Sequence, residues 1–107
     1  MQVIEDEGEF DRHQLQLVRE IARLVKQVLD RKGVAADLVP DLTEQLTFQL
    51  ATLLDGDSML EFEGRPFVPA IAFALNDERT QVLGAAGGSW MHEYAIGIAE
   101  SVCAEGG

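Results

Sequence analysis

Apolar residues recur every three or four positions between residues 12 and 32 and fill one half of a helical wheel. Asp11 suits the N-cap of such a helix, and Gln14 follows at the capping-box position. Arg31, Lys32 and Gly33 suit its C-terminal end, where cations and a left-handed glycine are favoured. The pattern therefore predicts a long helix that begins after Asp11 and ends before Gly33.

A second helical pattern follows after a short connection. Its apolar stripe is formed by Leu42, Leu46, Leu50 and Leu53. Asp37 is the expected N-cap, and Pro40 fits the first turn, where its missing N–H costs nothing. We expect a helix from about Leu38 to Leu54, packed antiparallel to the first because the connection is short.

The period then changes to that of strands. Residues 59–63 alternate between apolar and acidic side chains, and residues 63–66 suit a turn. Residues 67–75 are apolar on both faces, which favours a strand covered on both sides, although Pro69 also allows an edge, a bulge or the start of a short helix. A further strand is expected over residues 81–86. The last pattern predicts an amphipathic helix from Trp90 to Cys103.

These elements predict one α+β domain over residues 1–107. Its parts are an N-terminal antiparallel helical hairpin, a small antiparallel sheet of two or three strands, and a C-terminal amphipathic helix. Residues 1–10 are an acidic tail or a short edge strand, and residues 104–107 are a frayed tail.

Charge and composition limit the classes of partner and the compartment that we expect for this protein. The net charge of −11 repels nucleic acids and anionic membranes, so neither is expected to bind. The first ten residues are acidic, unlike a signal peptide, and the longest uncharged apolar run is too short to span a bilayer. The single cysteine, Cys103, fits a reducing compartment. We expect a cytoplasmic protein whose charged partner is basic.

Six of the eight basic residues lie between residues 12 and 32. Arg12, Arg19, Arg23 and Lys26 share the polar side of the first predicted helix. Such a stripe is either a solvated face or a docking surface for acidic groups, and the excess of negative charge elsewhere weakens its attraction for phosphates.

Few residues suggest chemistry. The segment 84–89 is a glycine-bearing loop before a helix, so Gly87, Gly88 and Ser89 could bind an anion, although the spacing matches neither a P-loop nor a dinucleotide fingerprint. The string Met91–Ile96 resembles the opening of the nickel-delivering hydrogenase maturation chaperones. In that family it stands at the N-terminus before a zinc ribbon of paired cysteines, whereas here it is internal and one cysteine is present. We expect no metal, no cofactor and no catalytic residues.

Phe48 is out of place on the second helix, on the side opposite the leucine stripe. Aromatic residues often anchor interfaces. The segment 67–75 is apolar on both faces, and burying both faces requires more packing surface than one small chain provides. The sequence favours a non-catalytic acidic interaction module, an adaptor, chaperone or inhibitor of a basic protein, that forms a homodimer. Glu61, Glu63 and Phe48 are the candidate partner-binding residues. The alternatives are a small-molecule or anion binder at Gly87–Ser89 and, less favoured, a small enzyme.

Overall fold

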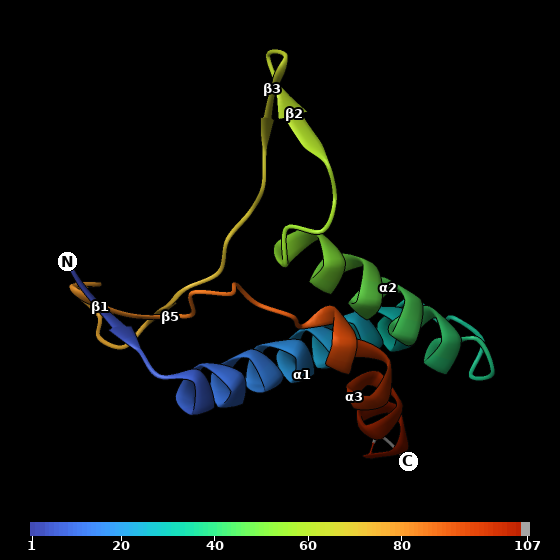
Figure 1. Ribbon diagram of the computed structural model, residues 1–107. Coiled ribbons are helices and arrows are strands. Elements are labelled where there is room, and N and C mark those ends of the chain that lie inside the picture. The colour runs from blue at the N-terminus through green and yellow to red at the C-terminus, as the bar shows by residue number, and fades with distance from the viewer. Residues whose placement is uncertain (106–107) are drawn as a thin grey trace.

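The computed structural model describes residues 1–105 and shows an α+β fold of three helices and two small sheets (Figure 1). The helices are α1 (Glu7–Arg31), α2 (Val39–Leu54) and α3 (His92–Glu105). The strands are β1 (Gln2–Glu5), β2 (Leu60–Phe62), β3 (Arg65–Phe67), β4 (Phe73–Ala74) and β5 (Gln81–Gly84). The predicted fold class is confirmed.

Helix α1 begins earlier than predicted. Its N-cap is Asp6, whose carboxylate accepts a hydrogen bond from the Glu9 N–H at 3.1 Å, so the prediction of Asp11 as N-cap is wrong. The extra turn is stabilised because it buries Phe10 completely, at the head of a stripe with four-residue spacing. That stripe consists of Phe10, Gln14, Val18 and Ala22. The helix ends as expected, with Gly33 at a φ of 73°.

Helix α2 has nearly the predicted bounds but buries a different stripe. Its N-cap is Leu38, without a side-chain cap bond, in place of Asp37. Its buried side chains are Val39, Thr43, Thr47 and Ala51. Three of the predicted core leucines, Leu46, Leu50 and Leu53, keep 37–41% of their surface exposed.

The strands form two separate sheets. One has the order β1-β5-β4, with β4–β5 antiparallel as predicted and β1 joined to β5 in parallel. A parallel pair is possible because α1 and the rest of the chain intervene between the two strands. Residues 2–5 of the predicted tail or edge strand therefore form an edge strand, whereas residues 7–10 belong to α1. The other sheet is the antiparallel hairpin β2–β3.

The segment 67–75 is not one strand covered on both sides. It contributes only its ends to β3 and β4, and residues 68–72 lie outside the strands. Phe67 and Val68 are 48% and 64% exposed. Pro69 lacks the N–H that a ladder needs, which is a physical reason for the break.

The final helix also begins later than predicted, at His92 instead of Trp90, and continues two residues past Cys103, to Glu105. Residues 106–107 of the predicted frayed tail lie outside the described residues. Helix α3 packs on both other helices through small side chains. The buried clusters are Val18, Ala51, Met91 and Ala95, and then Ala22, Ala99 and Val102. Much of this core is alanine, which lets the helices approach closely but buries little apolar area.

The molecule is extended for its length. Its radius of gyration is 15.5 Å, whereas a compact domain of this size has about 13 Å. Figure 1 shows the cause, because the β2–β3 hairpin projects away from the helices. None of the helices in residues 1–105 is both long and apolar enough to cross a membrane.

Candidate functional site

The predicted partner-binding residues lie on two separate elements. Phe48 is on α2, 39% exposed, with its ring edge-on to the His92 imidazole at a centroid distance of 6.2 Å. Glu61 is on β2, and Glu63 is in the turn that follows, with a φ of 51°. The alternation over residues 59–63 predicts that these two glutamates share one strand face, and the turn at Glu63 makes that prediction wrong. Glu63 and Gly64 both have positive φ, as a tight two-residue hairpin turn requires.

Helix α2 presents an apolar groove to solvent. Its lining is Leu46, Phe48, Gln49, Leu50, Thr52, Leu53 and Ser58, and we call it the α2 groove. It contains no charged side chain. Leu46 and Leu50 each lie one residue, about 100° of helix rotation, before a buried residue of the same helix.

The apolar surface continues onto α1. A second shallow groove is lined by Leu24, Val25, Val28, Leu29 and Leu46, so Leu46 is common to both. Leu24 and Val28 are 61% and 46% exposed. We call the whole surface the α1–α2 apolar face, defined by Leu24, Val28, Leu46, Phe48, Leu50 and Leu53. Contiguous exposed apolar surface of this kind marks interaction sites in proteins.

Buried polar atoms on the inward side of α2 contrast with these exposed leucines. Among the residues described, the hydroxyls of Thr43 and Thr47 are buried without a hydrogen-bond partner. An unpaired buried hydroxyl is unfavourable, and so is an exposed leucine stripe. Helix α2 thus buries threonines and exposes leucines. Binding of a further surface to the leucines would remove their apolar area from water and so account for this arrangement.

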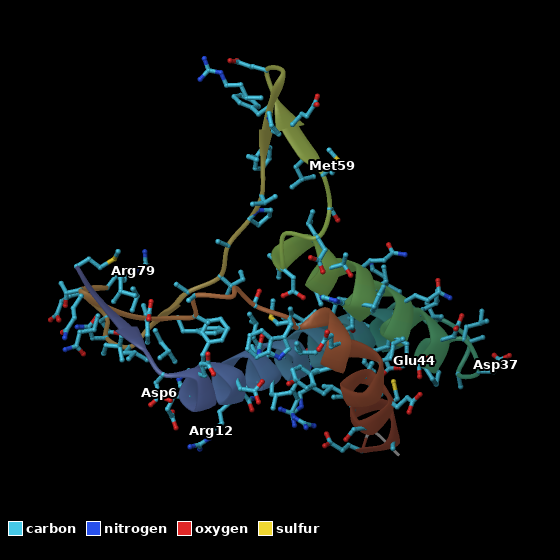
Figure 2. All side chains as sticks on the ribbon, in the orientation of Figure 1. Asp6, Arg12, Asp37, Glu44, Met59 and Arg79 are labelled. Atoms are coloured by element: carbon cyan, nitrogen blue, oxygen red, sulfur yellow. The ribbon has the colours of Figure 1, made fainter. Side chains whose placement is uncertain are left out.

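The second exposed apolar surface is the projecting hairpin, residues 59–68, which we call the arm. Figure 2 shows its side chains standing clear of the helices, beginning with Met59 near its base. Met59 and Phe62 are 92% and 68% exposed. A two-stranded hairpin is marginal in water without cover, so the arm also lacks a partner.

The junction of α2 and α3 differs from these exposed surfaces, because it contains a buried carboxylate whose two oxygens both accept hydrogen bonds. Asp55, the C-cap residue of α2, has a fully buried side chain. Its Oδ1 accepts from the Ser89 hydroxyl at 2.6 Å, and its Oδ2 accepts from the His92 N–H at 2.8 Å. The His92 Nδ1 lies 2.6 Å from the same Oδ2. Asp55 thereby caps the first turn of α3 from another helix.

These contacts shift two ionisation equilibria. Burial raises the pKa of Asp55, but the hydrogen bonds from Ser89, His92 and Met91 outweigh it and leave that pKa below its usual value. The hydrogen bond to Asp55 raises the pKa of His92 against the opposing effect of burial, with help from the charge of Asp57. The Asp57 carboxylate lies 3.2 Å from the His92 Nδ1.

The donor set of this junction favours a structural role. Asp55, Asp57 and His92 place their ligand atoms within 4.8 Å of one another, close enough for a metal ion. However, both Asp55 oxygens and the His92 Nδ1 already form hydrogen bonds inside the cluster. Ser89 donates to Asp55 and not to the imidazole, so the order of a Ser-His-Asp triad is not formed. The cluster fastens the end of α2 to the start of α3.

The same junction bears on the anion-binding prediction for Gly87, Gly88 and Ser89. Gly88 has a φ of 77°, as a tight turn requires. Ser89 and the first N–H of α3 are directed at the Asp55 carboxylate. An anion at this helix end would have to displace that carboxylate. The geometry therefore disfavours the anion-binding alternative.

A second polar network was missed by the sequence analysis. Gln14 is fully buried, and its Oε1 accepts from the Trp90 N–H at 3.0 Å. Its Nε2 donates to Asp11, which also accepts from the Tyr94 hydroxyl. The four-residue spacing that joins Gln14 to Phe10 and Val18 was the available signal. This network joins α1 to the start of α3.

The basic stripe of α1 is largely neutralised within the chain. The pairs are Arg12 with Glu9, Arg19 with Glu105, Arg23 with Glu20 and Glu105, and Lys26 with Asp30. Two of these arginines therefore meet an acidic residue of α3. The acidic surface keeps its excess of negative charge. Glu44 of α2 lies near Glu100 of α3. Burial, and next the negative charge of Glu100, raise the pKa of Glu44.

No protein-family model, curated protein sequence or solved structure matches this chain.

Proposed function

We propose that this chain is a non-catalytic protein-interaction module that works as a homodimer and presents an acidic surface to a basic protein, as an adaptor, chaperone or inhibitor. The observation that carries the proposal is the pattern of burial on α2, which exposes Leu46, Leu50 and Leu53 and buries Thr43 and Thr47. The α1–α2 apolar face fits a protein surface better than a small ligand, because it is shallow and spread over two helices.

The size of the apolar face supports self-association of limited strength. Fully burying one large apolar side chain is worth about 1.5–3 kcal/mol, so covering the exposed fractions of the six side chains gives roughly 5 kcal/mol per copy. Two copies that cover each other gain about 10 kcal/mol, whereas association costs about 4–15 kcal/mol. This face alone gives a marginal dimer, and a stable one needs further contact.

The acidic surface supports a basic partner. The net charge is −11, and most of the basic stripe that could have offset it locally is held by neighbouring carboxylates. Glu61 and Glu63 lie on the arm, exposed and away from those cations. The Glu44–Glu100 pair is a second place where a partner's lysine or arginine relieves repulsion.

Light scattering over a concentration series tests the self-association. A monomer has a mass of 11.7 kDa, and we expect twice that mass at micromolar concentration. Leu50→Ser with Leu53→Ser should weaken the dimer at least tenfold. Ile96→Ser is the matched control, because Ile96 is similarly exposed, at 47%, but lies on α3 outside the apolar face. A wild-type protein that stays monomeric would remove the homodimer.

The partner is tested by affinity purification from the native host and then by salt titration. We expect binding to weaken steeply between low and physiological salt, chiefly through a slower on-rate. Glu61→Lys with Glu63→Lys should weaken it further and leave the melting temperature nearly unchanged. Arg19→Glu with Arg23→Glu is the contrasting variant; greater damage from that pair would assign the contact to the basic stripe. An affinity that ignores both salt and the glutamate reversal would remove the acidic surface from the proposal.

A further inference from the structure

The arm carries both of its aromatic side chains on one side. In the β2–β3 register, Leu60 is opposite Phe67 and Phe62 is opposite Arg65. Directly paired residues, and residues two apart on one strand, share a face of a hairpin. Leu60, Phe62 and Phe67 therefore share one face, which we call the apolar side of the arm, with Arg65 beside Phe62 at the turn end. Glu61 and Pro66 lie on the other face.

The base of the arm fixes its direction. Gly56 has a φ of 80°, and a Cβ added there would lie 2.9 Å from the Pro69 carbonyl oxygen and 3.4 Å from the Val68 Cβ. The strand that returns from the arm thus packs directly on the loop that leaves α2. With this contact in place the arm extends away from its own helices, as both figures show.

The apolar side of the arm and the α2 groove are complementary in kind and lie on the same chain. The groove is lined by apolar and uncharged polar side chains, which suit the aromatic rings of the arm. Because the groove holds no acidic residue to pair with Arg65, the arrangement requires that the long Arg65 side chain, at the turn end of the arm, keeps its charged head in solvent. It ends at Ser58, the residue that leads into the arm. In a two-fold dimer, a contact from arm to groove occurs twice, since each copy supplies both surfaces.

We propose that the apolar side of the arm of one copy lies in the α2 groove of a second copy, and the reverse, so that the homodimer is held by exchanged arms. This deepens the proposed self-association and rests on it. In this arrangement the arm covers the groove part of the α1–α2 apolar face, and the exposed apolar side chains of the arm itself are buried in addition. The exchange also keeps Glu61 at the outer surface, available to a basic partner.

Disulfide trapping tests this arrangement directly. In a Cys103→Ser background, one chain carries Leu50→Cys, and a second chain of different tag mass carries Phe62→Cys or Phe67→Cys. After mild oxidation of the mixture, we expect at least one arm position to give tenfold more cross-linked heterodimer than the control pair Leu50→Cys with Ile96→Cys. Yields at the control level from both arm positions would overturn the proposal.

A single chain with both Leu50→Cys and Phe62→Cys separates exchange from folding back. At a concentration where light scattering gives a monomer, we expect both thiols to remain free to alkylation. A disulfide within that monomer would show that the arm covers its own groove, and would overturn the exchange.

The failure of the exchange and the failure of the homodimer have different signatures. Phe62→Ser with Phe67→Ser should raise the dimer dissociation constant at least tenfold, whereas Ile96→Ser should leave it within twofold of wild type. A dimer that is weakened by Leu50→Ser with Leu53→Ser but not by the arm variant overturns the exchange and retains the apolar face as the interface. A wild-type protein that is monomeric at all concentrations overturns both. Circular dichroism melting checks that each variant is folded.

Discussion

The helical junction around Asp55 and the arm differ in how completely their side chains are covered. At the junction the carboxylate oxygens are hydrogen-bonded, and the apolar residues of the adjoining core, such as Ala51 and Met91, are buried. On the arm, large residues such as Met59 and Phe62 are mostly exposed. The comparison separates two kinds of region, because the junction holds one chain together, whereas the arm and the α1–α2 apolar face are left exposed, as the proposed self-association requires.

The largest expected effect is the loss of the junction carboxylate. Asp55→Ala leaves the His92 N–H, the Ser89 hydroxyl and the His92 ring without their buried acceptor, at about 1–3 kcal/mol for each unsatisfied group. We expect a loss of about 3 kcal/mol or more in the free energy of unfolding, measured by urea denaturation. Asp57→Ala is the control, since that side chain is 52% exposed, and it should cost less than about 1 kcal/mol. Equal losses in the two variants would contradict the junction's role.

The second prediction sets a buried small residue against an exposed large one on the same helix. Ala51 is fully buried beside Val18 and Ala95, so Ala51→Leu should overpack that contact and cost about 1–3 kcal/mol of unfolding free energy. Leu50→Ala should cost less, under about 1 kcal/mol in the monomer, because 41% of that side chain is already in water. Urea denaturation at low protein concentration measures both. A larger loss from Leu50→Ala would assign the leucines to the monomer's own core.

The third prediction concerns the orphaned hydroxyls. Thr47→Val replaces a buried, unpaired hydroxyl by a methyl group of similar size, so it should stabilise the monomer by about 1 kcal/mol. Thr52→Val is the matched control on the same helix, because the Thr52 hydroxyl donates to the Phe48 carbonyl at 2.8 Å and has no buried penalty to relieve. Thermal melts of the two variants decide whether threonine at the buried position carries a real cost.

The helices were largely predictable from the sequence, because the helical spacing of apolar residues does not depend on which surface buries them. The choice of buried face was not. On α2 the leucine stripe and the stripe Val39, Thr43, Thr47 and Ala51 both have helical spacing, and periodicity favours the more apolar of the two. If the leucines belong to an interface, hydrophobicity alone selects the wrong face for the monomer.

The junction was hidden for a different reason. Asp55 and His92 are separated by 37 positions in the chain, and no sequence motif links them. Only the packing of α3 on α2 brings them together. Of the candidate site, Phe48 and the arm glutamates stay predictions. The register that places Phe62 and Phe67 on one side of the arm depends on a turn whose two central residues could not be placed from composition.

The smallest expected effect sharpens the comparison through pH. The lowered pKa of Asp55 contributes stability that is present above the unfolded-state pKa of about 3.9 and is lost as pH falls through the folded pKa. The raised pKa of His92 contributes stability that is complete below the unfolded-state pKa of about 6.5 and is lost as pH rises through the folded pKa.

The free energy of unfolding should therefore be highest between about pH 4 and 6.5 and decline above that window. Urea denaturation across the pH range measures the decline. His92→Gln should remove it, because glutamine does not titrate, whereas His13→Gln should preserve it. His13 is a suitable control because its Nδ1 lies 2.7 Å from a backbone carbonyl, that of Glu9, and it has no part in the junction. The arm variant Phe62→Ser with Phe67→Ser should also leave the monomer's profile unchanged, since the arm contributes no titrating group to the Asp55 cluster. A profile that followed the arm and not His92 would reverse the assignment of stability to the junction.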